Sequence, residues 1–228
     1  QNKKICIASM EMTPKHTLGR MMKQITGEMM PDSGHIAKAM DWIAPNLWLF
    51  VDKLTPKPDD LMQCFEYAYK RYGINVFVID SLTNMVRQDD YPEQQKFVER
   101  LVNFKQAFPI TLFLVTHSHK GEDEGKAPNK FDVKGSGAIT DLADSFISLW
   151  KNKKKTDHIE MCEATKSEPD PNIMKGWDIY LNVLKNRNGQ WEGVRGFKFD
   201  SGSCQYLPDK DHAARPYVRK PRPKDAPI

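Results

Sequence analysis

The chain has 228 residues, with 34 Lys and Arg against 30 Asp and Glu, which gives a net charge of +4. This length suits one domain, or one domain with extensions, and allows a sizeable core. No apolar run reaches the ~18 residues of a membrane-spanning helix, and the first apolar run, ICIASM, is too short for a secretory signal peptide. The small positive charge permits a nucleic-acid partner but does not require one.

Four cysteines are widely spaced and form no Cys-x-x-Cys motif: Cys6, Cys64, Cys162 and Cys204. Disulfide frameworks are typical of secreted proteins, whereas thiols stay reduced in the cytosol. We therefore expect a reduced cytoplasmic protein rather than a disulfide-stabilised one.

The first half of the chain alternates strand-like and helical segments. Apolar runs predict strands at residues 5–10, 46–52, 75–80 and 110–119, and helical patterns lie between and around them at residues 15–27, 33–44, 57–73 and 91–108. The first helix follows Thr13, a suitable N-cap, and Pro14, while the third ends at Gly73. This alternation is typical of an α/β fold with a mostly parallel sheet and helices on both faces.

The pattern changes from residue 145 onward. Strand-like runs at residues 145–153, 178–189 and 194–200 are joined by short or irregular connections, which predicts an antiparallel extension of the sheet. We expect the folded domain to cover residues 1–207. Residues 208–228 are basic and Pro-rich, so we expect a disordered, solvated tail, with a role in partner or nucleic-acid binding as the alternative.

Polar residues follow three of the predicted strands. Glu11 follows the first strand, Asp80 and Ser81 end the run INVFVIDSLTN, and His117 lies at the end of the fourth strand. Each residue alone also fits a structural role, such as a helix start, a strand end or a buried histidine. Because ligands bind at the carboxyl ends of the strands in parallel α/β sheets, their occurrence on successive strand ends favours a site.

An apolar strand ending in Asp is a common way to hold Mg²⁺ near a nucleotide. The ion prefers oxygen ligands and keeps several waters, so Asp80 on a rigid strand end would suffice. A second carboxylate nearby, Glu11, could polarise an attacking water, and such general-base help is worth roughly 10²–10⁴ in rate.

A long polar loop precedes the segment KGSGAI, which we expect to open a short helix that leads into a strand. Lysines that could contact phosphates without reading a base sequence occur at Lys120, Lys126, Lys130 and Lys134. A merely solvated loop is the alternative, because acidic residues at 122–124 dilute the charge.

The segment VLKNRNG places Lys185 and Arg187 on the same face of a predicted strand, just before an Asn-Gly turn. An ordinary hairpin explains this pattern. The functional alternative is a cationic finger that reaches phosphates, including those bound to a neighbouring subunit.

The motifs ASMEM, VFVIDSL, LFLVTHSHK, KGSGAITDLAD and LKNRNG occur in the order found in RecA-like motor domains of DnaB-type replicative ring helicases. The resemblance covers residues 3–207. Within this family, the sequence is most similar to the phage primase-helicases. VIDSL alone fits many ATPases, whereas GSGAI and LAD followed by LKNRNG are more specific. The resemblance implies a RecA-like P-loop NTPase core.

The resemblance also implies roles for the residues at the strand ends. Glu11 resembles the catalytic glutamate that activates water. Asp80, with Ser81 beside it, resembles the Walker B aspartate that holds Mg²⁺ through water. His117 resembles the sensor that contacts the γ-phosphate and couples to the DNA loop.

Further roles follow for the second half of the chain. Arg187, with Lys185, resembles the finger that reaches the nucleotide of the adjacent subunit. Asp141 stands where the family often has a glutamine that contacts phosphate, and a carboxylate there would repel a γ-phosphate.

The resemblance places the DNA contacts on two loops. Lys134, Gly135 and Gly137 resemble the DNA-contacting central loop, and Arg87 would lie near the other pore loop. The implied protein is a cytoplasmic, ATP- and Mg²⁺-dependent DNA helicase of a bacterium or a phage-infected cell. It would assemble as a ring, expected to be a hexamer, around single-stranded DNA, with a primase domain or other replication proteins as partners.

One departure is large: no Gly-x-x-x-x-Gly-Lys-Ser/Thr motif occurs in the chain. Because this loop cradles the β-phosphate, we expect the chain as given to bind ATP poorly and not to hydrolyse it. We expect a C-terminal fragment that begins within a fold, with apolar surface exposed where a strand and its helix would pack.

Three alternatives stay open. The chain could be a natural relative that has lost its ATPase activity. It could be an inactive RecA-like module that binds single-stranded nucleic acid or joins a ring. It could also be a recombinase-like or circadian-clock-like ATPase, which the GSGAI segment disfavours. The basic tail differs from the acidic tail with which the phage branch often binds its polymerase.

Overall fold

The computed structural model describes residues 3–51, 57–118, 128–129, 132–133, 135, 137–209 and 211–220. The strands are β1 (Ile5–Ser9), β2 (Leu47–Leu49), β3 (Val76–Asp80), β4 (Thr111–Leu114), β5 (Ser145–Lys151), β6 (Ile179–Asn186), β7 (Gly193–Asp200) and β8 (Gln205–Leu207). The helices are α1 (Pro14–Thr26), α2 (Ser33–Ile43), α3 (Pro58–Tyr72), α4 (Leu82–Met85), α5 (Tyr91–Ala107), α6 (Ala138–Leu142), α7 (Lys153–Thr165) and α8 (Pro171–Met174). None of the described helices is long and apolar enough to cross a membrane.

The first four strands form a parallel sheet in the order β2-β1-β3-β4. Ser9 at the end of β1 lies opposite Asp80 at the end of β3, and Ile79 lies opposite Leu114 at the end of β4. The carboxyl ends of these three strands therefore meet at one edge, as the α/β pattern predicted.

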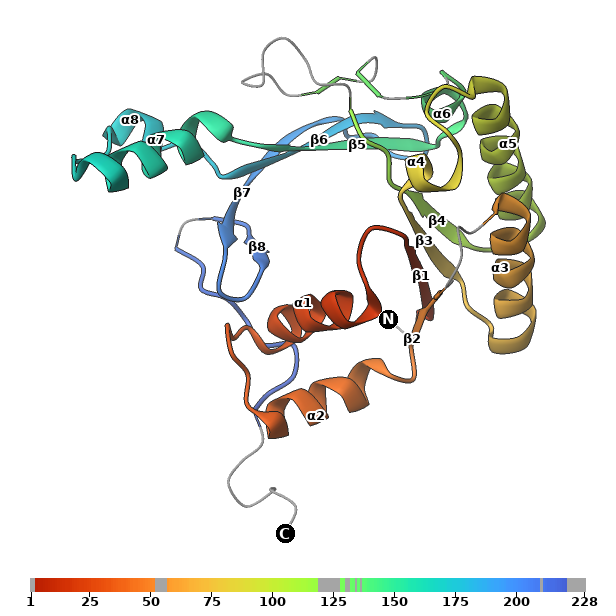
Figure 1. The fold of residues 1–228 in the computed structure, drawn as a ribbon, viewed down its shortest axis with the longest axis horizontal. Coiled ribbons are helices and arrows are strands. Elements are labelled where there is room, and N and C mark those ends of the chain that lie inside the picture. The colour runs from red at the N-terminus through yellow and green to blue at the C-terminus, as the bar shows by residue number, and fades with distance from the viewer. Residues whose placement is uncertain are drawn as a thin grey trace.

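One face of this sheet forms the main core. Alternate residues of β1 and β3, including Ala8 and Phe77, are buried against apolar side chains of α3 and α5 such as Phe65 and Phe97. Figure 1 shows α3 and α5 together on this side, with α1 and α2 on the other. The core explains why apolar residues recur at helical spacing in both covering helices.

Apolar side chains on the remaining strand faces stay exposed. Phe113 on β4 is 51% exposed and Leu149 on β5 is 63% exposed, and Val115 and Ile147 beside them are exposed as well.

Helix boundaries follow the capping residues read from the sequence. The Thr13 side chain accepts a hydrogen bond from the backbone N–H of His16 at the start of α1. Gly27 and Gly73 adopt left-handed φ values of 71° and 66° at the ends of α1 and α3, a conformation that favours glycine.

The antiparallel strands differ from the prediction in two ways. They form a separate sheet, β5-β6-β7-β8, which shares no strand pairing with the parallel sheet among the described residues. The connection from β5 to β6 is not short or irregular but contains the 13-residue helix α7, followed by α8. Because charged residues occupy nearly every side of α7, its sequence lacks the helical periodicity of apolar residues that would predict a helix.

The C-terminal segment also differs from the prediction. Residues 211–220 are ordered against α1 and α2 rather than free, while residues 210 and 221–228 lie outside the described residues. The Tyr217 backbone N–H donates to the Ile25 carbonyl at 2.7 Å, and Val218 is buried with Met22 and Ala39. A Pro-rich basic composition did not reveal this contact, because a single buried valine and backbone hydrogen bonds carry it.

Candidate functional site

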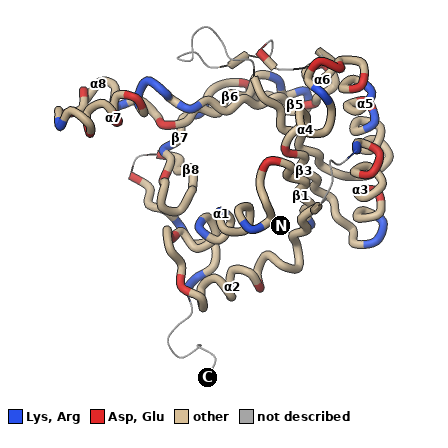
Figure 2. Tube along the Cα trace, viewed as in Figure 1, with Lys and Arg blue, Asp and Glu red and all other residues tan. Residues whose placement is uncertain are grey.

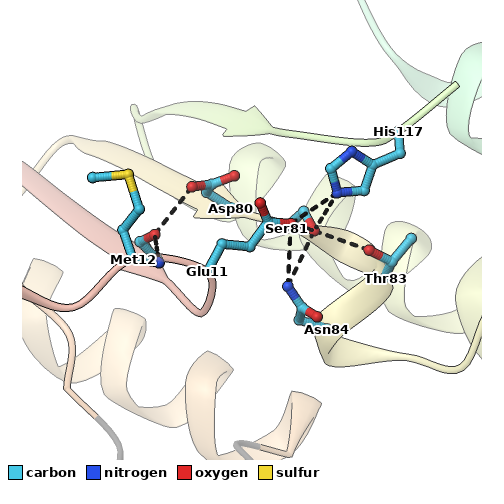
Figure 3. A network of polar contacts seen from close by, with 8 residues as sticks. Glu11, Met12, Asp80, Ser81, Thr83, Asn84 and His117 are labelled. Carbon is cyan, nitrogen blue, oxygen red and sulfur yellow. Dashed lines mark hydrogen bonds and ion pairs between the residues drawn. The ribbon is translucent and has the colours of Figure 1, made fainter. Parts of the chain in front are cut away.

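The predicted strand-end residues lie together at the carboxyl edge of the parallel sheet (Figure 3). Glu11 follows β1, and Asp80 ends β3. The chain after β4 stays paired with the neighbouring segment, since the Leu82 N–H donates to the Val115 carbonyl at 2.9 Å. This pairing directs His117 back toward Glu11.

Three side chains contact the same carboxylate oxygen of Glu11. Its Oε1 accepts from the Ser81 hydroxyl at 2.8 Å and from the Asn84 amide at 3.3 Å, and it lies 2.8 Å from His117 Nε2. The hydrogen bond from Ser81, followed by that from His117, holds the pKa of Glu11 below its usual range. The Glu11 side chain is 38% exposed, so water can reach it.

Ser81 is fully buried and forms the centre of the network. Its Oγ lies 3.0 Å from Thr83 Oγ1 and 3.4 Å from His117 Nε2. The same histidine nitrogen faces both Ser81 and Glu11, whereas a Ser-His-acid triad uses opposite ring nitrogens for its two partners. Ser81 therefore acts as a buried donor here, not as a nucleophile.

Asp80 is fixed by groups of β1. Its Oδ2 accepts from the Ser9 hydroxyl at 3.0 Å, and its backbone carbonyl accepts from the Met10 N–H at 2.7 Å. Ser9 Oγ is held in turn by the Met12 N–H at 3.2 Å. The Asp80–Ser81 peptide bond is cis.

The donor set at this edge suits Mg²⁺. Beside the His117 ring and the Asn84 amide, it offers the carboxylate oxygens of Asp80 and Glu11 and the Ser9 hydroxyl, which are the hard ligands that Mg²⁺ prefers. The described residues contain no group of three His, Cys, Asp or Glu side chains able to hold a metal alone. A single carboxylate matches an ion bound largely through water and substrate phosphates.

Lys185 on β6 and Arg187, one residue past its end, both reach the end of α6. Lys185 Nζ donates to the carbonyls of Thr140 and Asp141, both at 2.9 Å. Arg187 donates to the Asp141 carbonyl at 3.3 Å and stays 54% exposed. Asp141 thus offers its backbone oxygen to this pair, a contact that the sequence did not indicate.

Asp144 joins this cluster and was not predicted. It forms an ion pair with Lys105 of α5, and its Oδ1 lies 3.6 Å from Arg187 Nη1. The hydrogen bond from Lys105 holds the pKa of Asp144 below its usual range. The acidic residue of the LAD motif was the only sequence signal for it.

The expected DNA contacts are only partly within the described residues. Lys120, Lys126, Lys130 and Lys134 lie outside the described residues. Gly135 has a φ of 126° and packs against Gln94, and Gly137 precedes α6, where its carbonyl accepts from the Thr140 N–H at 3.2 Å. Arg87 is exposed and pairs with Asp89 at 3.1 Å. Figure 2 shows Lys and Arg spread over several elements rather than gathered on one.

Sequence reasoning missed Asn84 and Thr83, which complete the network around Glu11. They belong to the same DSLTN run as Asp80. A run of hydroxyl and amide side chains just after an apolar strand was the available signal.

No protein-family model matches the chain. A curated relative, the DNA helicase/primase of Enterobacteria phage T3, is 27% identical over 105 residues, which are 42% of this chain and 19% of the relative. The chain therefore spans about a fifth of the length of that relative.

Two solved structures share the fold. A DnaB-like replicative helicase, studied with its primase, matches with a TM-score of 0.67 and 15% identity over 90% of this chain and 50% of its own. A second structure, described as an ATPase domain, matches with a TM-score of 0.68 and 16% identity over 92% of this chain and 75% of its own. The chain is thus similar to the motor domain of DnaB-type replicative helicases. The similarity covers the RecA-like fold over most of the chain and the sequence over 105 residues.

Proposed function

We propose that this chain belongs to the motor of an ATP-dependent DNA helicase, which couples ATP hydrolysis at subunit interfaces to movement along single-stranded DNA. One observation carries the proposal. Glu11, Asp80 and His117, which are up to 106 residues apart in the sequence, are brought to one edge of a parallel sheet. A protein that only bound nucleic acid would have no use for an exposed carboxylate held beside a histidine and a strand-end aspartate.

The roles follow from the contacts. Asp80, held by Ser9, would bind Mg²⁺, which supplies charge neutralisation on the phosphates when it is bound. Glu11 would orient the attacking water and accept its proton. His117, 46% exposed and 2.8 Å from Glu11, would report whether a phosphate is present.

Arg187 and Lys185 would act on nucleotide held by a neighbouring copy in a ring. Arg187 is more than half exposed, and its side chain is held by one hydrogen bond to the Asp141 carbonyl and by the 3.6 Å ion pair with Asp144. An arginine supplied across an interface stabilises the charge that develops in phosphoryl transfer, worth about 10³–10⁵ in rate.

The test uses two chains: residues 1–228 and a chain extended by the residues encoded upstream. We expect the extended chain to carry a phosphate-binding loop and to hydrolyse ATP faster when single-stranded DNA is present. Glu11→Gln should abolish hydrolysis and retain nucleotide binding, and Arg187→Ala should do the same.

Exposed residues of the same types provide the controls. Glu99→Gln on α5 and Arg71→Ala on α3 should leave hydrolysis unchanged. Full ATPase activity of Glu11→Gln would rule out its proposed role in water activation. Full activity of Arg187→Ala would rule out its proposed role at the nucleotide of a neighbouring subunit.

The second candidate is a catalytically inactive RecA-like module that binds single-stranded nucleic acid or joins a ring. The absence of a Gly-x-x-x-x-Gly-Lys-Ser/Thr motif from the 228 residues favours it. In that case an extended chain would shift the fluorescence anisotropy of a labelled oligothymidylate without hydrolysing ATP.

A further inference from the structure

Three aromatic side chains pack together at the amino-terminal edge of the parallel sheet. Trp48 lies on β2, the outermost strand, and its ring centroid is 5.9 Å from that of Tyr72. Tyr67 meets Tyr72 edge to face, with ring centroids 6.0 Å apart. Tyr72 ends α3, from which the chain enters β3 (Figure 1), so this aromatic cluster lies at the opposite edge of the sheet from Glu11.

Lys4, just before β1, adds a positive charge to the aromatic cluster. Its Nζ lies 5.8 Å from the centroid of the Trp48 ring and donates to the Tyr72 carbonyl at 2.7 Å. The face of the ring attracts the ammonium group electrostatically. Because an ammonium group has three donors, Lys4 can contact a phosphate as well.

The exposed apolar surface of the aromatic cluster consists of rings. The cluster and Lys4 come from residues 3–5, 46–49 and 66–75, and within these described ranges the large apolar side chains exposed to solvent are Tyr67, at 58%, and Tyr72, at 41%. Flat rings without exposed aliphatic neighbours offer stacking area rather than the mixed apolar core of a protein interface.

The charges around the aromatic cluster are mainly positive. Lys3 and Lys4 precede β1, and the last turn of α3 is basic. The three ranges hold a single carboxylate side chain, Glu66, which is paired with Lys70. A polyanion therefore meets no unpaired carboxylate within these ranges. Aromatic rings interleaved with cations are typical of surfaces that bind single-stranded nucleic acid.

We propose that the aromatic cluster and Lys4 form a stacking surface for single-stranded nucleic acid. Tyr67 and Tyr72 would each offer a ring to a base, and Lys4 would contact a phosphate without reading the base sequence. The surface lies at the opposite sheet edge from Glu11 and Asp80, so it requires neither bound nucleotide nor hydrolysis. It is also separate from the loops on which the family resemblance places the DNA contacts.

The first test measures the affinity of residues 1–228 for a labelled oligothymidylate by fluorescence anisotropy. Tyr67→Ala should weaken binding roughly 5- to 150-fold, which is the loss of one stacked base. Tyr67→Phe keeps the ring and should bind as the wild type does. Tyr72 packs on Trp48, so Tyr72→Leu, which keeps an apolar contact, tests the second ring and should also weaken binding.

A matched tyrosine provides the control. Tyr206 on β8 is 52% exposed and packs on Phe199 with ring centroids 5.3 Å apart, so Tyr206→Ala removes a similarly exposed, similarly packed ring elsewhere. This variant should bind as the wild type does. Wild-type affinity of Tyr67→Ala, or the absence of any binding by the wild type, would overturn the proposal.

The second test separates the bases from the backbone. The wild type should bind oligothymidylate more tightly than an abasic oligonucleotide of the same length, and Tyr67→Ala should reduce this difference. Equal wild-type affinity for the two oligonucleotides would overturn the stacking role. Displacement of oligothymidylate by polyglutamate at equal charge concentration would show that charge alone is recognised, and would overturn it too.

The third test examines Lys4 through the salt dependence of binding. Lys4→Gln should lower the slope of log affinity against log salt concentration by about 0.7, as expected for one phosphate contact on a single strand. Lys96→Gln, an exposed lysine on α5, should leave the slope unchanged. An unchanged slope in Lys4→Gln would overturn the phosphate contact.

These outcomes separate the inference from the proposed function. Weakened binding by Tyr67→Ala, together with an extended chain that hydrolyses no ATP, would retain the stacking surface and remove the helicase proposal. Wild-type affinity of Tyr67→Ala, together with ATP hydrolysis that Glu11→Gln abolishes, would retain the helicase proposal and remove the stacking surface.

Discussion

Replacement of Asp178 by Ala should destabilise the protein more than any exposed charge reversal on α7. Lys155 lies in the first turn of α7 with only 11% of its side chain exposed, and its Nζ donates to Asp178 Oδ1 at 2.6 Å and to the Gly176 carbonyl at 2.9 Å. Asp178 also accepts from the Phe199 N–H of β7 at 2.9 Å. The pair therefore fastens α7 to the antiparallel sheet.

The loss in the free energy of unfolding depends on which charged partner each substitution leaves unpaired. Removing one partner of a fully buried pair costs about 3–5 kcal/mol, and the partial exposure of Asp178 reduces this to about 2–3 kcal/mol for Asp178→Ala. Lys155→Met keeps the apolar stem and leaves a carboxylate that retains its backbone donor and water. We expect that variant to cost about 1 kcal/mol or less.

Urea denaturation followed by far-UV circular dichroism measures both free energies of unfolding, with equal m-values as the condition for comparing them. Lys154→Ala, on the exposed side of the same turn, is the control and should be neutral. Equal costs for Asp178→Ala and Lys155→Met would refute the reasoning, because they would show that the stranded lysine charge carries no penalty.

Three further outcomes are expected. Gly135→Ala should lower the free energy of unfolding by roughly 1–3 kcal/mol in thermal or urea melts, because its methyl group would lie 2.5 Å from Gln94 Oε1 at a φ of 126°. The low pKa of Asp144 means that its contribution to stability is present above the unfolded pKa and is lost as pH falls through the folded one. The stability gap between wild type and Asp144→Asn should therefore shrink from pH 7 toward pH 3, and a constant gap would contradict the assignment. Val218→Ala should lower the free energy of unfolding by about 1–2 kcal/mol. Lys220→Ala, which removes an exposed ion pair, should lower it by under ~1 kcal/mol, and differential scanning calorimetry of these two variants can check both values.

The sequence allowed the parallel sheet and its edge to be predicted because the relevant signals are local. Apolar runs, first-turn prolines and terminal glycines mark each element, and Asp80 ends an apolar run on its own strand. Parallel strands then require Glu11, Asp80 and His117 to share an edge, and the hydrogen bonds around Glu11 agree with this.

The parts that could not be predicted depend on contacts between distant residues. Asn84 reaches Glu11 across 73 positions, and nothing in its own segment indicates which carboxylate it will meet. Helix α7 buries Lys155 where an apolar residue would be expected, and the partner of this lysine, Asp178, lies 23 positions away. Likewise, a tail that composition describes as disordered is ordered because the Ile25 carbonyl of α1 accepts its backbone hydrogen bonds, His35 of α2 bonds the Val218 carbonyl, and the two helices bury Val218 among apolar side chains.

The contact of residues 211–220 with the N-terminal helices determines where a mechanical pull on the C-terminus would act. Lys220 Nζ lies 2.7 Å from Asp32 at the start of α2, and Tyr217 is hydrogen-bonded to Ile25 at the end of α1. These contacts would bear the tension, and α1, which carries Ile25, directly follows the segment that carries Glu11. The chain thus has a route by which strain at its C-terminal segment reaches the base of the site without crossing the antiparallel sheet.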